Sequence, residues 1–223
     1  MEPFELPFGE GRLRISPSKI IGLVRTYPSH AAEMGSGRPE RLWFFLKPPS
    51  SLLPPDSTIL LPPSVGEAHH EVELAVIVGR RGKDIRRGEG LNHILGYTIM
   101  LDITARELQA EAKRERMPWG APKGFDTFAP LGPKVVPRDE LDPGDLEIGL
   151  KVNGQVRQRG RTSEMLFTVG EVVEELSRIM TLQEGDIIAT GTPSGVGPIE
   201  EGDVIEAWIE GIGTLTESIE RLR

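Results

Sequence analysis

The sequence predicts a mainly β (α+β) fold in one domain spanning residues 1–223, with a short N-terminal segment at 1–18. Three observations favour this class. Short apolar runs recur between glycines and prolines, which number 26 and 19, and this pattern is typical of strands. Only two segments show the 3.6-residue spacing of an amphipathic helix. No repeat or linker divides the 223 residues, a length that one domain accommodates.

Strands are predicted where β-branched or aromatic residues are bounded by turn-forming residues. One pair forms a hairpin, because Asn153-Gly154 is a preferred sequence for a two-residue turn between antiparallel strands. The predicted strands cover residues 19–24, 42–46, 58–61, 71–78, 97–101, 147–152, a hairpin partner from 155 onward, 187–190 and 204–209.

Two segments are predicted to be helical. Thr104 and Glu107 have the spacing of a capping box, so a helix is expected over residues 104–116. The second helix covers 169–180, where apolar residues recur at helical spacing. That spacing indicates packing against the core and does not by itself indicate a functional site.

Irregular structure is predicted for two long stretches rich in proline and glycine, 28–41 and 117–137. Long irregular segments in a compact domain are usually functional. A third run, 185–197, reads as a turn, a buried strand and a glycine-rich loop. Its glycines would let the backbone approach a small ligand, with the Thr192 hydroxyl available as a donor, although a plain turn fits equally well.

Composition excludes several classes of function. The formal net charge of −8 argues against a nucleic-acid partner, since phosphate contacts need clustered Lys and Arg. The absence of cysteine excludes disulfides, thiolate catalysis and cysteine-based zinc sites. The longest apolar run, 74–78, is far short of a membrane span. The acidic, proline-containing N-terminus does not read as a signal peptide, so a cytoplasmic location is expected.

Glu71 and Glu73 are the most informative pair of residues. They lie two apart in a strand-like run, so both carboxylates project from the same face. Two like charges beside apolar residues repel each other and lose hydration unless a cation lies between them. A bound divalent metal ion would remove this repulsion. The alternative is an ordinary strand with a solvated glutamate face.

Asp102 follows a second apolar strand and is a plausible third oxygen ligand beside Glu71 and Glu73. Alone, it would be interpreted as a helix cap. Three carboxylates without cysteine suit a hard cation, which favours Mg²⁺ or Mn²⁺ over Zn²⁺. His70 lies on the face opposite Glu71 and is interpreted as structural.

His30 and Glu33 form a second candidate pair. Pro28 could start and Gly35 could stop a short helical turn, which would place His30 and Glu33 three residues apart on one face. A carboxylate beside an imidazole orients the ring and raises its basicity, so His30 is a candidate general base. An exposed surface turn is the alternative.

Taken in order, these motifs resemble the fumarylacetoacetate hydrolase family, and most closely its small single-domain acylpyruvase and oxaloacetate decarboxylase members. The resemblance spans about 19–210, and it implies a mixed β-roll or β-sandwich that is usually a homodimer. It rests on the following segments: 25–27 with His30 and Glu33, 45–48, 69–74, 96–97, 102–106, Gln109, Trp119, 123–126, 185–188 and 190–193.

The resemblance also implies roles for individual residues. Three would bind Mg²⁺ or Mn²⁺: Glu71, Glu73 and Asp102. Lys123 would contact the substrate near the metal, and His30 and Glu33 would act as a dyad on a lid over the substrate. Four further positions match residues that line the family's pocket: Arg25, Arg106, Gln109 and Thr192. Thr26 stands where many relatives carry asparagine, which leaves details of substrate contact open.

Three functions follow as expectations. The first is metal-dependent cleavage of a C–C bond in small dioxo acids, as in acylpyruvate hydrolysis or oxaloacetate decarboxylation. The second, within the same family, is a 2-hydroxyhepta-2,4-diene-1,7-dioate isomerase or 5-carboxymethyl-2-oxo-hex-3-ene-1,6-dioate decarboxylase of aromatic catabolism. The third is a non-catalytic metal-binding β module. The His30–Glu33 pair discriminates against the third, because a structural calcium site has no use for a general base.

Overall fold

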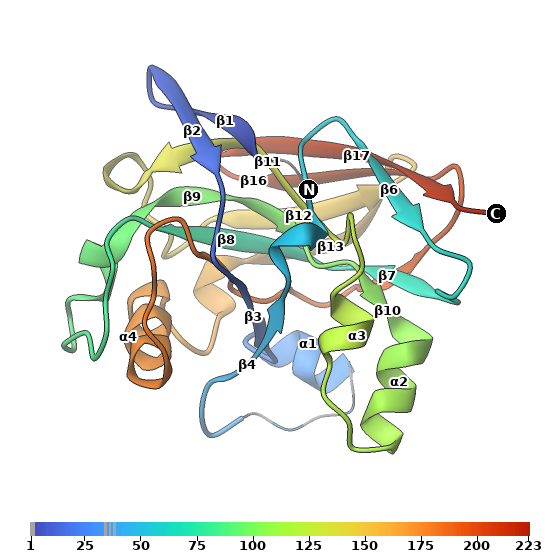
Figure 1. The fold of residues 1–223 in the computed structure, drawn as a ribbon, viewed down its shortest axis with the longest axis horizontal. Helices are drawn as coiled ribbons and strands as arrows, with labels where there is room; N and C mark the ends of the chain where they lie inside the picture. Colours follow the sequence, from blue (N-terminus) through green and yellow to red (C-terminus); the bar gives the residue numbers. More distant parts are fainter. Residues whose placement is uncertain (1–2, 34, 36, 38) are drawn as a thin grey trace.

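Strands β8 (Val72–Val78) and β9 (Ile94–Leu101) form the centre of the protein, as Figure 1 shows. They belong to a nine-stranded sheet that packs against a five-stranded sheet, and a three-stranded sheet lies at one side. The computed structural model describes residues 3–33, 35, 37 and 39–223. The fold is mostly β with few helices, as the sequence predicts.

The nine-stranded sheet has the order β2-β1-β11-β9-β8-β14-β3-β4, with β5 paired to β11. Its other strands are β1 (Phe4–Phe8), β2 (Gly11–Ile15), β3 (Ile20–Val24), β4 (Trp43–Lys47), β5 (Leu52–Leu53), β11 (Ala129–Pro137) and β14 (Ile187–Ala189).

The five-stranded sheet has the order β13-β12-β16-β17-β6, and the three-stranded sheet the order β10-β7-β15. Their strands are β6 (Thr58–Leu61), β7 (Ala68–His70), β10 (Thr104–Ala105), β12 (Glu147–Val152), β13 (Gln155–Arg161), β15 (Gly197–Ile199), β16 (Val204–Ile209) and β17 (Gly213–Arg221). The helices are α1 (Pro28–Glu33), α2 (Arg106–Arg114), α3 (Gly120–Lys123) and α4 (Val169–Ile179).

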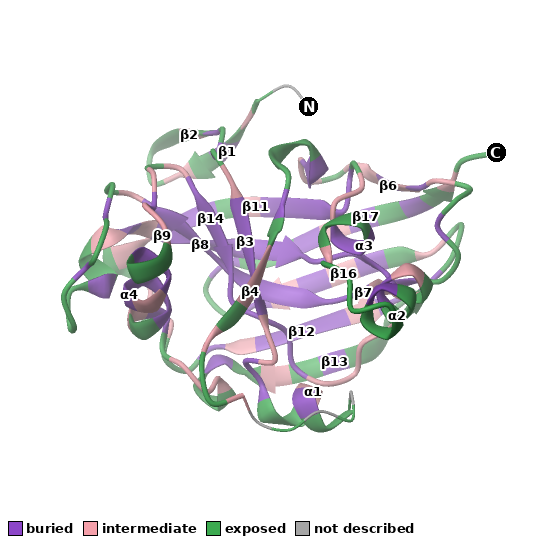
Figure 2. Cartoon of the chain, turned by 60° about the horizontal axis from the view of Figure 1, so that its bottom comes forward, coloured by how far each residue is buried: buried purple, intermediate pink, exposed green. Residues whose placement is uncertain are grey.

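Both faces of β8 are buried, which Figure 2 shows as a continuous purple strand. Val72 and Leu74 join the larger core, together with residues of the five-stranded sheet. Ala75 and Ile77 join a second core on the opposite face. Because side chains alternate along a strand, Glu73 shares the face of Ala75 and Ile77, as the sequence predicts.

Helix α4 confirms the second predicted helix. Thr168 caps its N-terminus by accepting a hydrogen bond from the amide of Glu171, whose carboxylate accepts one from the Thr168 amide in return. Val172, Val173 and Leu176 pack into the larger core. Within the described part of the chain, every helix is too short or too polar to cross a bilayer.

The capping box predicted at Thr104 is wrong. Thr104 and Ala105 form β10 and pair with β7, so helix α2 begins only at Arg106. The Thr104 hydroxyl donates to the carbonyl of Asp102 and does not cap the helix. Thr104 pairs with His69, which lies 35 residues earlier in the chain. This strand pairing overrides the local capping signal.

The prediction that 117–137 is irregular is also wrong. Helix α3 and strand β11 lie within it, and prolines at 130, 133 and 137 conceal the strand pattern of β11. Strands β1, β2, β7, β15 and β17 were not predicted either. In the other stretch, 28–41, helix α1 confirms the predicted turn, while residues 34, 36 and 38 lie outside the described residues.

Candidate functional site

Three carboxyl groups meet where β8 and β9 lie side by side. One oxygen each from Glu71, Glu73 and Asp102 lies within 4.8 Å of the others, and all three residues are buried. The antiparallel register explains the meeting, because Glu73 pairs with Met100 and the amide of Asp102 donates to the carbonyl of Glu71 across 2.8 Å. The sequence predicted this trio, and the fold brings it together.

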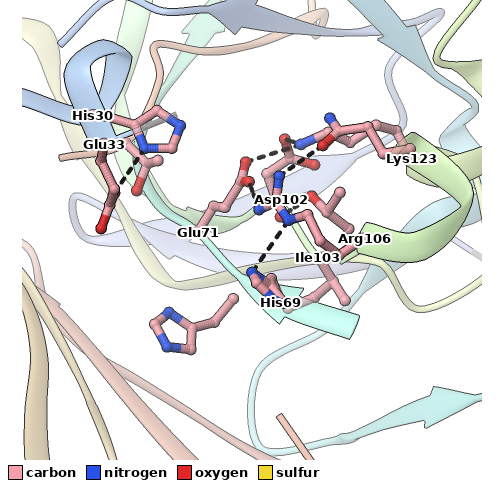
Figure 3. Close-up of polar contacts among 12 residues, drawn as sticks. His30, Glu33, His69, Glu71, Asp102, Ile103, Arg106 and Lys123 are labelled. Atoms are coloured by element: carbon pink, nitrogen blue, oxygen red, sulfur yellow. Dashed lines mark hydrogen bonds and ion pairs between the residues drawn. The ribbon is translucent and has the colours of Figure 1, made fainter. Parts of the chain in front are cut away.

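Three cations surround two of these carboxylates. Lys123 donates to Glu71 Oε2 at 2.9 Å and also to Asp102 Oδ2. Lys47 donates to Asp102 Oδ1 at 2.7 Å, and Arg106 Nη2 to Glu71 Oε1 at 2.5 Å. Figure 3 shows Lys123 and Arg106 directed toward Asp102 and Glu71. Both lysines are almost fully buried, so their charges are balanced inside the protein.

The unequal sharing of cations shifts the pKa values of Glu71 and Glu73 in opposite directions. Burial would raise the pKa of Glu71, but Lys123 and Arg106 hold it well below its usual range. Burial raises the pKa of Glu73, and the neighbouring charges of Asp102 and Glu71 raise it further. Burial would lower the pKa of Lys123, but Asp102 and Glu71 raise it instead.

These residues fit a hard divalent cation. Glu73 accepts a hydrogen bond from the Gly191 amide at 2.7 Å but, among the described residues, makes no ion pair. A dication held between Glu71, Glu73 and Asp102 would supply the missing positive charge. Carboxylate oxygens are the preferred ligands of Mg²⁺ and Mn²⁺.

His30 and Glu33 lie on α1, at the side of Glu71 opposite Lys123 (Figure 3). His30 Nδ1 lies 3.2 Å from Glu33 Oε2, as the predicted spacing requires. The amide of Gly195 donates to Glu33 Oε1 at 3.0 Å, which ties the carboxylate to the glycine-rich loop. This arrangement orients the imidazole ring and leaves Nε2 for chemistry.

A small cavity joins the carboxylates to the histidine. Its walls include the following predicted residues: Arg25, His30, Glu71, Glu73, Arg106, Gln109, Lys123 and Thr192. The other two predicted residues contact residues of this wall. Asp102 accepts a hydrogen bond from Lys123, and Glu33 forms a hydrogen bond with His30. The structure therefore gathers all ten predicted site residues into one place.

Three hydrogen-bond contacts fix side chains in and beside the cavity. Arg106 Nη1 donates to Gln109 Oε1 at 2.6 Å, so these two pocket residues hold each other. The Thr192 hydroxyl accepts from Gln158 Nε2 at 2.7 Å, which leaves its own proton for the donor role suggested by the sequence. Gln158 also contacts His70 Nδ1 at 3.0 Å, which is consistent with the structural role predicted for His70.

Sequence reasoning assigned no role to two cations of the site, Lys47 and Lys113, although Lys47 lies in the segment 45–48 that contributes to the family resemblance. Lys47 ends the strand Trp43–Lys47 and shares a face with Trp43 and Phe45, so a lysine that closes an otherwise apolar strand was the available signal. Lys113 lines the cavity and lies over the Trp119 ring at 5.3 Å. One helical turn above Gln109, it had no sequence signal separating it from ordinary surface lysines.

Comparison with known proteins agrees with this geometry. The family model described as fumarylacetoacetate (FAA) hydrolase, C-terminal, matches residues 19–220. An uncharacterized protein of Pyrococcus abyssi is 59% identical over 214 residues, which cover 96% of this chain and 95% of that protein. The mitochondrial oxaloacetate tautomerase of Arabidopsis thaliana is 44% identical over 205 residues, which cover 92% of each.

A solved structure extends the comparison to the fold. The crystal structure of fumarylpyruvate hydrolase from Pseudomonas aeruginosa, in complex with Mn²⁺ and pyruvate, matches with a TM-score of 0.92 at 33% identity. The match covers 99% of this chain and 97% of that one. The resemblance found in the sequence is thus confirmed over nearly the whole chain. This chain belongs to the fumarylacetoacetate hydrolase family.

Proposed function

We propose that this chain is a Mg²⁺- or Mn²⁺-dependent enzyme that cleaves a C–C bond in small dioxo acids. Its reactions would be the hydrolysis of acylpyruvates and the decarboxylation of oxaloacetate. The observation that carries the proposal is the buried trio of Glu71, Glu73 and Asp102 in one cavity with His30. The Mn²⁺ and pyruvate of the Pseudomonas aeruginosa hydrolase complex support the same class of chemistry.

The two reactions share one difficult feature, which is negative charge on the pyruvate fragment as the C–C bond breaks. Hydrolysis adds water to the distal carbonyl and gives a carboxylic acid and pyruvate, whereas decarboxylation releases CO₂ and needs no water. A bound Mg²⁺ or Mn²⁺ would act as a Lewis acid toward the 2-oxo acid and stabilise the developing enolate.

The protein's own groups would bind the acid and move the proton. Arg25 and Lys113 line the cavity and supply positive charge for the substrate carboxylate. His30, oriented by Glu33, would take a proton from the attacking water and return one to the departing fragment. Lys123, held at the carboxylate cluster, would offset negative charge near the reacting carbons.

A second candidate is proton transfer without bond cleavage, as in a tautomerase or in the dienedioate isomerases of aromatic catabolism. The 44% identity to an oxaloacetate tautomerase favours it. Such a reaction moves a proton between carbon and oxygen and uses no hydrolytic water. The same His30–Glu33 pair could carry that proton, so product analysis must distinguish the two candidates.

Purified protein should be incubated with Mn²⁺, with Mg²⁺ or with EDTA, and given acetylpyruvate, oxaloacetate or a hydroxymuconate-type dienedioate. Pyruvate release from the first two substrates, lost with EDTA, is the expected result. Loss of the enol absorbance of oxaloacetate without pyruvate would instead favour the tautomerase.

Glu73→Gln keeps the size of the side chain and removes its charge. It should abolish both Mn²⁺ binding, measured by calorimetry, and pyruvate release. Unchanged Mn²⁺ affinity in that variant would reject Glu73 as a ligand and with it the site proposed here.

A further inference from the structure

A second cavity lies at the N-terminal half of α4, away from the carboxylate trio. Its volume is about 560 Å³, which is in the usual range of small-molecule sites. We call it the α4 cavity, and its walls come from residues within 87–91, 142–144 and 162–174. Helix α4 lies at one end of the molecule and α2, which lines the catalytic cavity, at the other (Figure 1). Among the described residues, the two cavities share no part of their walls.

Glu174 places a carboxylate in the wall of the α4 cavity although only 6% of the residue is exposed. Its Oε1 accepts hydrogen bonds from the amides of Gly88 at 2.7 Å and Gly90 at 3.2 Å. Within the described part of the chain, no donor and no cation contacts Oε2. Nor is Oε2 enclosed, because the enclosed side-chain atoms that lack a partner there are Tyr27 Oη and Glu217 Oε1. Oε2 therefore opens on the cavity.

The structural role of Glu174 does not require its charge. Its two amide contacts hold the loop 88–90 against α4, and the side-chain oxygen of a glutamine would accept them equally well. A carboxylate buried without a cation loses hydration that two amide hydrogen bonds replace only in part. Among the described residues of the wall, Arg87 is the one cation, and it is exposed and makes no ion pair with Glu174. A cationic ligand would supply the missing charge.

Apolar side chains form much of the remaining wall. Met165 and Phe167 are half-buried and pack against the larger core, and Val169 belongs to that core. Leu91 adds an apolar side chain that is 44% exposed. Sites of this kind, with apolar walls and few polar groups, bind an apolar body and use the polar groups to fix its orientation.

The positive end of α4 does not make this an anion site. A helix N-terminus attracts anions, but the Glu171 carboxylate already lies there and accepts from the amide and the hydroxyl of Thr168. The side chains lining the cavity include three carboxylates, those of Asp142, Glu171 and Glu174, and one guanidinium, that of Arg87. The balance of charge favours a cation.

We propose that the α4 cavity binds a small organic cation, an amine, amidine or guanidine carried on an aromatic or alkyl body. The charged group would donate to Glu174 Oε2, and the apolar body would lie against Leu91, Met165 and Phe167. Because the residues of the catalytic cavity take no part in this site, the proposal stands whether or not the chain cleaves dioxo acids.

Benzamidine is a suitable probe, because it carries a planar cation on an aromatic ring, and benzamide is its neutral analogue of the same shape. Each is titrated by calorimetry into the full chain and its variants. Benzamidine should bind the wild type, and benzamide should bind at least about tenfold more weakly, the usual effect of a hydrogen bond to a charged group.

Glu174→Gln keeps an acceptor for the Gly88 and Gly90 amides and removes the charge, so it should weaken benzamidine binding about tenfold or more with unchanged circular dichroism. Glu175→Gln is the matched control, since Glu175 is the next residue of α4, pairs with Arg178 at 2.6 Å and does not line the cavity. It should bind benzamidine as the wild type does.

Leu91→Ala provides a second variant at an exposed position, where the fold tolerates substitution, and should weaken benzamidine binding several-fold by shortening the apolar wall. A wild type that binds no benzamidine at millimolar concentration would overturn the proposal. Equal affinities of the wild type and Glu174→Gln would overturn it as well, because the probe would then bind elsewhere. Equal affinities for benzamidine and benzamide would show that the cavity does not select a cation. None of these failures affects the proposed chemistry, since that rests on pyruvate release.

Discussion

Lys47 and Asp102 form a buried ion pair, 2.7 Å from Nζ to Oδ1, that joins the outermost strand of the main sheet to its centre. Lys47 also donates to the carbonyl of Ile103 at 3.3 Å. The pair fixes one oxygen of Asp102, while the other faces Lys123 and the remaining carboxylates. Strand β4 thereby positions a candidate metal ligand although it supplies none itself.

Lys47→Met is expected to destabilise the protein by about 3 kcal/mol, because it removes one partner of a buried ion pair and leaves the carboxylate only partly balanced. Added Mn²⁺ should restore more stability to this variant than to the wild type, since a dication would balance Asp102 again. Chemical denaturation with and without Mn²⁺ measures both effects. Exposed Lys134→Met is the control. A Lys47 variant as stable as this control would refute the prediction.

His30→Ala should retain Mn²⁺ binding but lose acylpyruvate hydrolysis by roughly 10²–10⁴-fold, the usual contribution of a general base. His30 contacts Glu33 and makes no hydrogen bond to the carboxylate trio, so the metal site should stay intact. Calorimetry with Mn²⁺ and a pyruvate-coupled rate assay separate the two properties. Hydrolysis at the wild-type rate would remove His30 from the mechanism.

Gly191→Ala should weaken Mn²⁺ binding at least tenfold. Gly191 has φ +95°, and a Cβ there would lie 1.9 Å from Thr26 Oγ1, so the backbone must shift. That shift would move the Gly191 amide from Glu73 Oε2. Gly202→Ala is the control, because Gly202 has a similar φ of +87° but meets nothing within 4 Å. Equal Mn²⁺ affinities for the two variants would contradict the prediction.

Glu217 is expected to lower the free energy of unfolding as the pH rises. Its Oε2 accepts from the Ser57 amide at 2.9 Å, while Oε1 has no partner among the described residues. Burial raises the pKa of Glu217 from 4.5 to about 8. The folded state therefore holds a proton that the unfolded state has lost, and stability decreases by about 1.4 kcal/mol per pH unit between these two values.

Glu217→Gln mimics the protonated acid and should lack this contribution. The difference in unfolding free energy between the variant and the wild type, measured from pH 5 to pH 9 by urea denaturation, should therefore grow with pH and level off above about 8. A difference independent of pH would show that Glu217 titrates normally.

Thr168→Ala should cost about 1 kcal/mol, the usual contribution of an N-terminal cap. The variant loses the hydroxyl that accepts from the Glu171 amide and leaves that amide unpaired. Thr168→Ser keeps the hydroxyl and should restore most of the loss. Thermal unfolding of the three proteins is sufficient, and an alanine variant as stable as the serine variant would argue against the cap.

Much of the candidate site was predictable because its signals are local. Glu71 and Glu73 share a face through the two-residue period of a strand, and His30 and Glu33 meet through the three-residue spacing of a helical turn. Asp102 was predictable because it directly follows an apolar strand. Family resemblance supplied the remaining residues, such as Lys123, whose position no local pattern indicates.

The fold was predictable to a similar degree. Strands β6, β12 and β16 have the predicted bounds, and α4 differs from its prediction at one end by a single residue. Strand β11 was missed because three prolines interrupt its pattern, and β9 and β5 beside it supply the pairing that the local sequence does not show. At Thr104 the local pattern predicted a helix cap where the structure has a strand, because pairing with β7 outweighs the capping pattern.

The sequence alone determined the fold class and two local pairs, Glu71 with Glu73 and His30 with Glu33, because the members of each pair are close together in the chain. Asp102 lies about 30 residues beyond Glu71 and joins the trio through the pairing of β8 with β9. Only the tertiary structure decided which cations balance the trio. Lys47 and Asp102 are 55 residues apart in the chain and come together only when the sheet has assembled. The tertiary structure also decided where apolar surface stays exposed, which follows from β4 being the last strand of its sheet. Burial and long-range pairing arise from the assembled chain, and no short segment encodes them.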